Sequence, residues 1–250
     1  MFDLSEKKAI VTGAARGLGY AMAEGLCEVG VEVCILDISS NLEDAVQSLR
    51  QKGFKVHGLQ ADLSNLSELK TTFENALKKM NGKIDILVNN AGIHKPMPAL
   101  ELPVKEFSKI LDVNVTVVFE LARYAAEEMS KYGEGKIINI ASVLATQGGF
   151  NASAYSTSKG AVALLTKSLS NEWASKGINV NAIAPGYFTT ELNNHILNDP
   201  ERLDSLVSRI PKGRFGNPEE LKGIIQFLSS NKASYVSGAV IPIDGGFLGR

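Results

Sequence analysis

The feature that most constrains the fold is the regular alternation of short apolar runs with longer segments of helical periodicity. Runs with few polar interruptions predict strands at 8–13, 31–37, 54–62, 84–92, 135–142, 178–186 and 239–246. Such strands are typical of a parallel sheet that is covered on both faces. The intervening segments predict helices at 17–29, 41–52, 65–80, 103–131, 153–176 and 217–229. Repeated strand–helix alternation indicates right-handed crossover units stacked side by side.

We therefore expect an α/β fold, a single Rossmann-type doubly wound parallel sheet of about seven strands with helices on both faces. No linker, repeat or low-complexity segment divides the chain, so we expect one domain over 1–250. Residues 187–214 break the rhythm with a polar excursion, which is typical of a substrate lid. In the helix 153–176, a stripe at four-residue steps is expected to face the core: Ala161, Leu165, Leu169 and Trp173.

Composition excludes several classes of protein. Hydrophobic residues make up 44% of the chain and charged residues 21%, which is ordinary globular usage. The net charge is −1 with no basic tract, so we expect no nucleic-acid partner. No apolar run is long enough for a membrane span or a signal peptide, and we expect a cytoplasmic protein. Cys27 and Cys34 fit buried, reduced thiols, and the scattered histidines argue against a metal site.

A glycine-rich turn follows the first predicted strand. The stretch "VTGAARGLG" places Gly13, Gly17 and Gly19 where the strand gives way to a helix. Glycines there allow a tight turn and bring backbone N–H groups and a helix N-terminus against a pyrophosphate. A turn packed for structure alone is the alternative, but its place after the first strand favours a dinucleotide.

Asp37 ends the second predicted strand, 18 residues after Gly19. A carboxylate there can accept hydrogen bonds from the adenosine ribose and repels a 2′-phosphate. The next residues, Ile38 and Ser39, offer no cation for that phosphate. Arg16 argues for NADP instead, since its guanidinium could bind a 2′-phosphate. We rank Asp37 above it and expect NAD rather than NADP.

Tyr155 and Lys159 lie four residues apart in "SAYSTSKGAV", so they are neighbours on one helix face. A cation beside a phenol favours phenolate and lowers the pKa of the tyrosine. That makes a general acid/base for neutral pH, although most such pairs on protein surfaces have no chemical role. Farther upstream, "NNAG" at 89–92 ends the fourth predicted strand, and its small residues allow a ligand to approach the backbone.

In combination these motifs resemble the short-chain dehydrogenase/reductase family over essentially the whole chain. The resemblance rests on motifs in the family's order and spacing: Thr12-Gly13 with Gly17 and Gly19, Asp62 in "ADLS", "NNAG" at 89–92, Asn114 in "DVNV", Ser142 in "INIAS", Tyr155 with Lys159, and Pro185-Gly186 followed by Thr190. Each motif is weak alone, and together they are specific.

The resemblance implies a role for each matched residue. Tyr155 would be the general acid/base, Lys159 would lower its pKa and hold the nicotinamide ribose, and Ser142 would bind the substrate oxygen. Asn114 would support a proton relay through water to Lys159. The resemblance also implies cofactor contacts over the remaining motifs: Gly13, Arg16, Gly17, Leu18, Gly19, Asp37, Asp62, Leu63, Asn89, Ala91, Gly92, Tyr155, Lys159, Pro185, Gly186, Phe188 and Thr190. It further suggests a homotetramer.

The second half of the chain is most similar to the family's sugar-acid branch. "IINIASVLATQGG", "NEWASKGINVNAIAPGY" and "RIPKGRFGNPEEL" resemble dehydrogenases of gluconate and its deoxy derivatives. A sugar acid carries a carboxylate, and Lys95, just beyond the fourth strand, could bind it, although a solvated loop lysine is the alternative. Further hydrogen-bonding candidates for the substrate pocket are Ser142, Gln147, Asn151 and Tyr187.

Three functions therefore stay in competition. The first is an NAD-dependent alcohol/ketone oxidoreductase acting on a sugar acid. The second, still an enzyme, is a 3-oxoacyl-acyl-carrier-protein reductase or another polyol dehydrogenase. The third is a non-catalytic dinucleotide-binding sensor, against which the complete set of Asn114, Ser142, Tyr155 and Lys159 argues, because a sensor needs no acid/base.

Overall fold

The computed structural model describes residues 2–249 and places seven parallel strands in one sheet. The strand order is β3-β2-β1-β4-β5-β6-β7, so the direction of winding reverses between β1 and β4. This confirms the predicted doubly wound sheet. The strands are β1 (Lys8–Thr12), β2 (Glu32–Asp37), β3 (Val56–Gln60), β4 (Ile86–Asn89), β5 (Gly135–Ile140), β6 (Ile178–Pro185) and β7 (Val240–Ile243).

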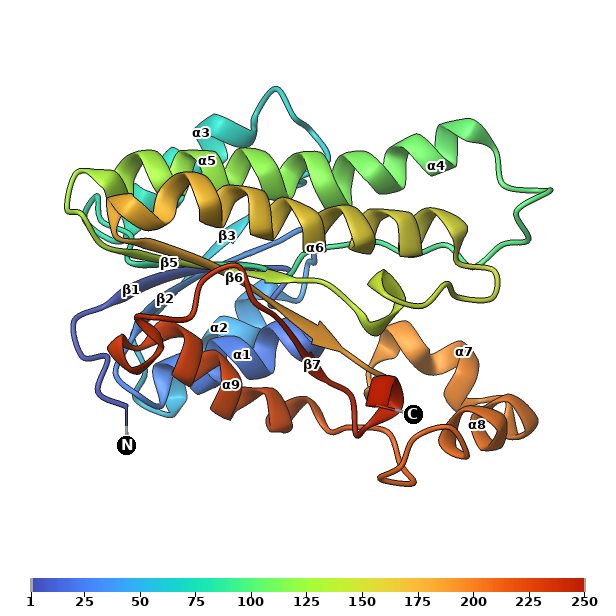
Figure 1. Cartoon of the computed structure of the whole chain (residues 1–250). Coiled ribbons are helices and arrows are strands. Elements are labelled where there is room, and N and C mark those ends of the chain that lie inside the picture. The colour runs from blue at the N-terminus through green and yellow to red at the C-terminus, as the bar shows by residue number, and fades with distance from the viewer. Residues whose placement is uncertain (1, 250) are drawn as a thin grey trace.

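Helices cover both faces of the sheet (Figure 1). The α-helices of the described chain are α1 (Gly17–Cys27), α2 (Leu42–Gln51), α3 (Leu69–Lys79), α4 (Val104–Leu111), α5 (Val117–Ser130), α6 (Ser153–Trp173), α7 (Asn194–Leu197), α8 (Pro200–Val207) and α9 (Lys222–Ser229). Helices α1, α2 and α9 pack on one face against Val11, Val33 and Ile35. Helices α3, α5 and α6 pack on the other face. Successive strand residues point to opposite faces, which explains why the predicted runs are apolar throughout.

The buried face of α6 differs from the predicted stripe. Leu169 and Trp173 are buried in the core, but Ala161 and Leu165 are only half-buried. The fully buried side chains one position along the helix are Val162 and Thr166. Four-residue steps drift around a helix of 3.6 residues per turn, so a stripe at that spacing cannot stay on one line of contact.

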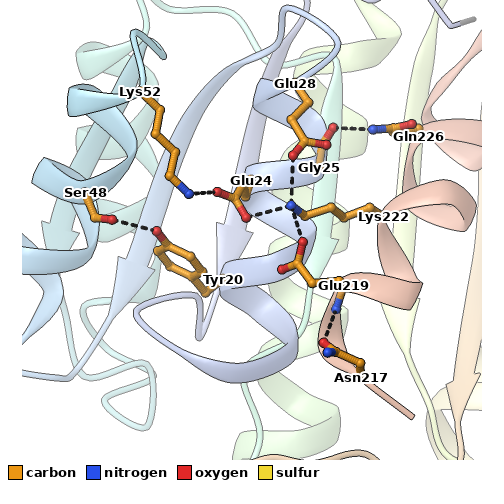
Figure 2. Close-up of polar contacts among 10 residues, drawn as sticks. All are labelled: Tyr20, Glu24, Gly25, Glu28, Ser48, Lys52, Asn217, Glu219, Lys222 and Gln226. Carbon is orange, nitrogen blue, oxygen red and sulfur yellow. Dashed lines mark hydrogen bonds and ion pairs between the residues drawn. The ribbon is translucent and has the colours of Figure 1, made fainter.

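One ionic cluster ties α1 to the two helices beside it (Figure 2). Glu24 of α1 is 5% exposed and pairs with Lys52 at the end of α2. It also pairs with Lys222 of α9 at 2.7 Å, and Lys222 reaches Glu28 at 2.8 Å. Burial lowers the pKa of Lys222, but its hydrogen bonds to Glu219, Glu24 and Glu28 outweigh that effect, and the net shift is upward. The cluster thereby fixes α1, whose first residues form the glycine-rich turn.

The excursion after β6 carries its own helices and a small core. Tyr187 and Thr189 exchange backbone hydrogen bonds with Gly216, at 2.9 Å each, which ties the two ends of the excursion together. Helices α7 and α8 lie between these ends (Figure 1). A separate hydrophobic cluster holds the excursion against the C-terminal segment: Val143, Ile196, Ile210, Phe215 and Phe247. This segment was predicted to be a lid because it is polar. It packs through a few apolar residues that lie far apart in its sequence.

Candidate active site

Two cavities lie at the carboxyl edge of the sheet, where parallel strands deliver their last residues. The larger, about 600 Å³, is lined by the ends of β1 and β2 and by the glycine-rich turn. The smaller, about 320 Å³, lies between the end of β5 and the excursion. Both cavities are lined by the same four residues, so they adjoin there: Leu18, Ile140, Tyr155 and Thr190.

The glycine-rich turn lines the larger cavity with exposed backbone. Gly17 has φ +60°, a conformation that favours glycine, and a side chain at Gly13 would lie 2.8 Å from the Cα of Ala91. Helix α1 begins at Gly17, with no side chain bonded to its first N–H groups and no acidic residue in its first turn. A helix start of this kind suits an anion such as a pyrophosphate. The residues present therefore fit a dinucleotide.

Asp37 is held rigidly at the rim of the same cavity. One carboxylate oxygen accepts the N–H of Ala15 and the other accepts the N–H of Ser39, both at 2.9 Å. Arg16 forms an ion pair with Glu191 of the excursion, and both side chains are exposed. Asp37 can thus present its carboxylate to a bound ribose while the guanidinium of Arg16 is engaged elsewhere.

Most of the predicted cofactor residues do line this cavity. Gly13, Arg16, Gly17, Leu18, Gly19, Asp37, Asp62, Leu63, Ala91, Gly92, Tyr155, Lys159 and Thr190 all do so. Pro185, Gly186 and Phe188 instead line the smaller cavity, beside the shared Thr190.

Asn89 does not line either cavity. It is buried, and its amide donates to the side chain of Asn139 at 3.0 Å, within the sheet. Its neighbour Asn90 lines the larger cavity and donates to the backbone oxygens of Thr12 and Gly13. Since neighbouring strand residues alternate in direction, the repeated asparagines of "NNAG" do not share one surface. Lys109 of α4 also lines the cavity, and nothing in its local sequence predicts that position.

Ser142 and Tyr155 both line the smaller cavity. The N–H of Leu144 donates to the Ser142 hydroxyl oxygen at 3.1 Å, which leaves the hydroxyl hydrogen available to a ligand or to Tyr155. Burial raises the pKa of Tyr155 to about 12, and the hydrogen bond from Ser142 opposes this rise. The sequence predicted that Lys159 lowers the pKa of Tyr155, but in the structure burial raises this pKa. With this pKa the phenol carries its proton at neutral pH.

Lys159 is nearly fully buried, and its Nζ lies 5.7 Å from the centroid of the Tyr155 ring. Its ammonium donates to the backbone oxygen of Ile140 at 2.6 Å. Burial lowers the pKa of Lys159 to about 8. The ring of His94 packs against Tyr155, with its centroid 4.5 Å from that of the Tyr155 ring. Desolvation is thus the largest cause of the pKa shifts of both Tyr155 and Lys159.

Asn114 lies in a short π-helical stretch, Asp112–Thr116, between α4 and α5. Its side chain is fully buried, accepts the N–H of Ile93 at 2.8 Å and donates to the hydroxyl of Ser158 at 2.9 Å. Such π-helical turns are frequent at functional sites. The predicted single helix over 103–131 is therefore continuous but locally widened. The side chain of Asn114 thus joins the loop after β4 to α6, close to Tyr155.

The predicted substrate residues are divided by the structure. Gln147 and Tyr187 line the smaller cavity with Ser142. Asn151 is not among its lining residues, and its backbone oxygen accepts the N–H of Met97. Lys95 lines neither cavity and pairs with Glu106 of α4 at 3.2 Å. An exposed loop lysine bound to a carboxylate is poorly placed for a substrate at Tyr155.

Two kinds of feature are absent from the residues that the structure describes, 2–249. No three histidine, cysteine, aspartate or glutamate side chains gather closely enough to hold a metal ion. Within the same range, no helix combines the length and apolarity that a bilayer crossing requires.

Comparison with known proteins gives one consistent group. Residues 13–248 match the sequence model of a family described as Enoyl-(Acyl carrier protein) reductase. The chain is 44% identical to 2-dehydro-3-deoxy-D-gluconate 5-dehydrogenase of Pseudoalteromonas atlantica, covering 100% of this chain and 98% of that protein. It is 38% identical to gluconate 5-dehydrogenase of Gluconobacter oxydans, covering 98% and 96%. A crystal structure of a gluconate 5-dehydrogenase from Burkholderia cenocepacia with NADP and tartrate superposes with a TM-score of 0.94, at 35% identity and 100% and 98% coverage.

Proposed function

Since the chain belongs to the short-chain dehydrogenase/reductase family and is an oxidoreductase, we propose that it interconverts a secondary alcohol and a ketone on a sugar acid. Gluconate, a deoxygluconate or their keto forms are the proposed substrates. The observation that carries the proposal is the junction of the two cavities at Tyr155, with the Ser142 hydroxyl in the same substrate-sized space. The relatives at 38–44% identity over nearly their full length support the substrate class.

The residues would divide the chemistry as follows. The nicotinamide, when bound, accepts or supplies the hydride. The Ser142 hydroxyl donates a hydrogen bond to the substrate oxygen, and Tyr155 gives its proton to that oxygen during reduction or removes it during oxidation. Lys159 lies beside the phenol, and Asn114 fixes α6, which carries both residues, to the loop after β4. Helices α7 and α8 would act as a lid that excludes water from this space.

We propose NAD as the preferred cofactor. The negative charge of Asp37 at the ribose position supports it, because a 2′-phosphate beside a fixed carboxylate is repelled. The ion pair between Arg16 and Glu191 supports it as well, because it occupies the cation that would otherwise receive that phosphate. The NADP in the related gluconate 5-dehydrogenase makes a direct comparison of the two cofactors the necessary measurement.

A homotetramer is the proposed assembly. Several large apolar side chains of the described chain are exposed, among them Leu164 on α6 and Phe119 on α5, and light scattering of the purified protein tests their burial between subunits. The free, buried Cys27 and Cys34 support a reducing compartment such as the cytoplasm.

The decisive experiment is a spectrophotometric screen at 340 nm. NAD+ and NADP+ are each offered with a panel of sugar acids and neutral polyols, and NADH and NADPH with keto acids and 3-oxoacyl thioesters. Turnover confined to sugar acids and their keto forms supports the proposal. Turnover of 3-oxoacyl thioesters alone would replace it with the reductase named above. Cofactor binding without any turnover would point to a sensor.

A further inference from the structure

Two arginines lie on the wall of the smaller cavity, opposite the end of β5. Arg202 and Arg209 both line the space that contains Ser142 and Tyr155. Among the described residues that line this cavity, none is an aspartate or a glutamate. The side of the cavity formed by the excursion is therefore positively charged.

The two arginines come from α8 and from the turn that follows it. Arg202, Ser205 and Leu206 of α8 line the cavity, at a spacing that keeps them on one side of the helix. Arg209 lies two residues after the end of α8 and lines the same cavity. Its N–H donates to the backbone oxygen of Leu206 at 3.0 Å, which holds the turn against the helix. Long side chains at both positions can therefore reach one group in the cavity.

Neither guanidinium is paired with a carboxylate of the described residues. Within residues 2–249, no carboxylate lies within ion-pair distance of Arg202 or Arg209. By contrast, Arg214 lies nearby in the sequence and binds Glu220 through two 2.8 Å hydrogen bonds. Arg209 instead lies over the ring of Phe247, 4.8 Å from its centroid, and this contact holds it without cancelling its charge.

The field of the two arginines reaches a hydroxyl inside the cavity. Burial raises the pKa of Tyr187, while Arg209 and Arg202 each oppose that rise electrostatically. Tyr187 lines the same cavity and packs on Phe247, with ring centroids 5.4 Å apart. The two charges therefore act on the interior of the cavity and not only on the solvent.

We propose that Arg202 and Arg209 bind the carboxylate of the substrate acid, so that α8 and the turn after it determine the preference for acids over neutral sugars. Guanidinium groups match the planar geometry of a carboxylate and bind it through paired hydrogen bonds. The proposal rests on the proposed sugar-acid function and deepens it. It assigns to α8 the role that the sequence suggested for Lys95.

The test compares a charged substrate with its neutral counterpart. Reduction of 5-keto-D-gluconate and of its uncharged carboxamide is followed for the wild-type enzyme, Arg202→Gln, Arg209→Gln and the double variant. Arg209→Lys keeps the charge but loses the paired geometry. Arg214→Gln is the matched control, because that arginine lies outside this cavity, and Lys95→Gln tests the rival site.

We expect each glutamine variant to raise KM for the keto acid by about ten- to a hundredfold, as expected for a charged hydrogen bond. Activity on the carboxamide should stay at the wild-type level, which also shows that the variants fold. Arg209→Lys should fall between wild type and Arg209→Gln. Arg214→Gln and Lys95→Gln should match the wild type.

The outcomes separate this inference from the proposed function. Wild-type turnover of sugar acids with unchanged KM in both arginine variants would overturn the inference alone. An equal loss on acid and carboxamide would also overturn it, because the arginines would then act on the fold of α8. A wild-type enzyme without activity on any sugar acid would overturn the proposed function, and the inference with it.

Discussion

The ammonium group of Lys159 donates a 2.6 Å hydrogen bond to the backbone oxygen of Ile140, the last residue of β5. This bond anchors α6 to the edge of the sheet and fixes the position of Tyr155 one helical turn earlier. Lys159 is only 4% exposed, so this hydrogen bond is buried. The same lysine that anchors α6 is thus a costly group to bury when it is charged.

Lys159 should therefore make the stability of the cofactor-free protein depend on pH in a defined window. Its pKa falls from 10.5 to about 8 on folding, so the unfolded chain holds more protons between these values and stability rises with pH there. Below pH 8 both states are protonated and the contribution is constant. The free energy of unfolding of the wild type, relative to Lys159→Met, should gain roughly 3 kcal/mol from pH 8 to pH 10.5.

Urea denaturation at several pH values measures this difference. Lys167→Met, on the exposed side of the same helix, is the control and should show no such window. A constant difference between wild type and Lys159→Met across the range would contradict the burial argument.

Tyr155→Phe should remove turnover while leaving the cofactor bound. The substitution deletes the hydroxyl at the junction of the two cavities and keeps the ring that packs on His94. Loss of a general acid/base costs about a hundred- to ten-thousandfold in kcat. Steady-state kinetics and fluorescence titration with NADH check the two parts. Tyr132→Phe, at an exposed position, should be silent. Substantial activity in Tyr155→Phe would remove this residue from its assigned role.

The two directions of the reaction should respond differently to pH. Burial raises the pKa of Tyr155 to about 12 in the cofactor-free protein, so the phenol carries its proton throughout the neutral range. Reduction needs that proton and should be nearly flat from about pH 6 to 8, whereas oxidation needs the deprotonated base and should accelerate by up to about tenfold per pH unit. Profiles of kcat/KM in both directions provide the check. An oxidation rate that is independent of pH would argue against a tyrosine base.

Asp37→Asn should shift the cofactor preference toward NADP. The amide is close in shape to the carboxylate, so its contacts with Ala15 and Ser39 can partly persist while the charge is removed. We expect the ratio of kcat/KM for NADP over NAD to rise by about tenfold, the effect of one charge-assisted hydrogen bond. Asp62→Asn, at another carboxylate lining the same cavity, serves for comparison. An unchanged ratio would mean that Asp37 does not face the ribose.

Glu24→Gln should destabilise the fold. Glu24 is buried between Lys52 and Lys222, and removing its charge leaves these cations without their buried partner (Figure 2). Breaking a buried pair on one side costs about 3 kcal/mol, against less than about 1 kcal/mol for an exposed one. Glu219→Gln, which loses an exposed partner of the same Lys222, is the matched control. Urea midpoints that fall equally in both variants would show that burial of Glu24 adds nothing.

The strand–helix alternation was sufficient to predict the sheet, because each apolar run must be covered on both faces wherever it lies. The glycine-rich turn was likewise predictable from sequence, since Gly17 needs φ +60° and the requirement is local. The proximity of Tyr155 and Lys159 was also predictable, because residues four apart on a helix are neighbours in any tertiary context.

Contacts between distant segments could not be predicted in the same way. Lys95 was expected at the substrate, but Glu106 on α4 binds it. Asn89 was expected at the cofactor, but Asn139 on the neighbouring strand binds it inside the sheet. Neither partner lies close to its residue in sequence, so the chain order gives no signal for the pairing.

The sequence by itself determined the order of the elements, the turn that fits a pyrophosphate and the chemical groups of the candidate site, because these depend on neighbours within a few residues. The tertiary structure alone decided how far the pKa values of those groups shift and which of the groups line the smaller cavity. Burial reverses the expected shift in the pKa of Tyr155, and the packing of the excursion brings Arg202 and Arg209 to the cavity that Tyr155 lines. Desolvation and charge proximity depend on the packing of segments that are remote along the chain, which is why only the folded structure shows them.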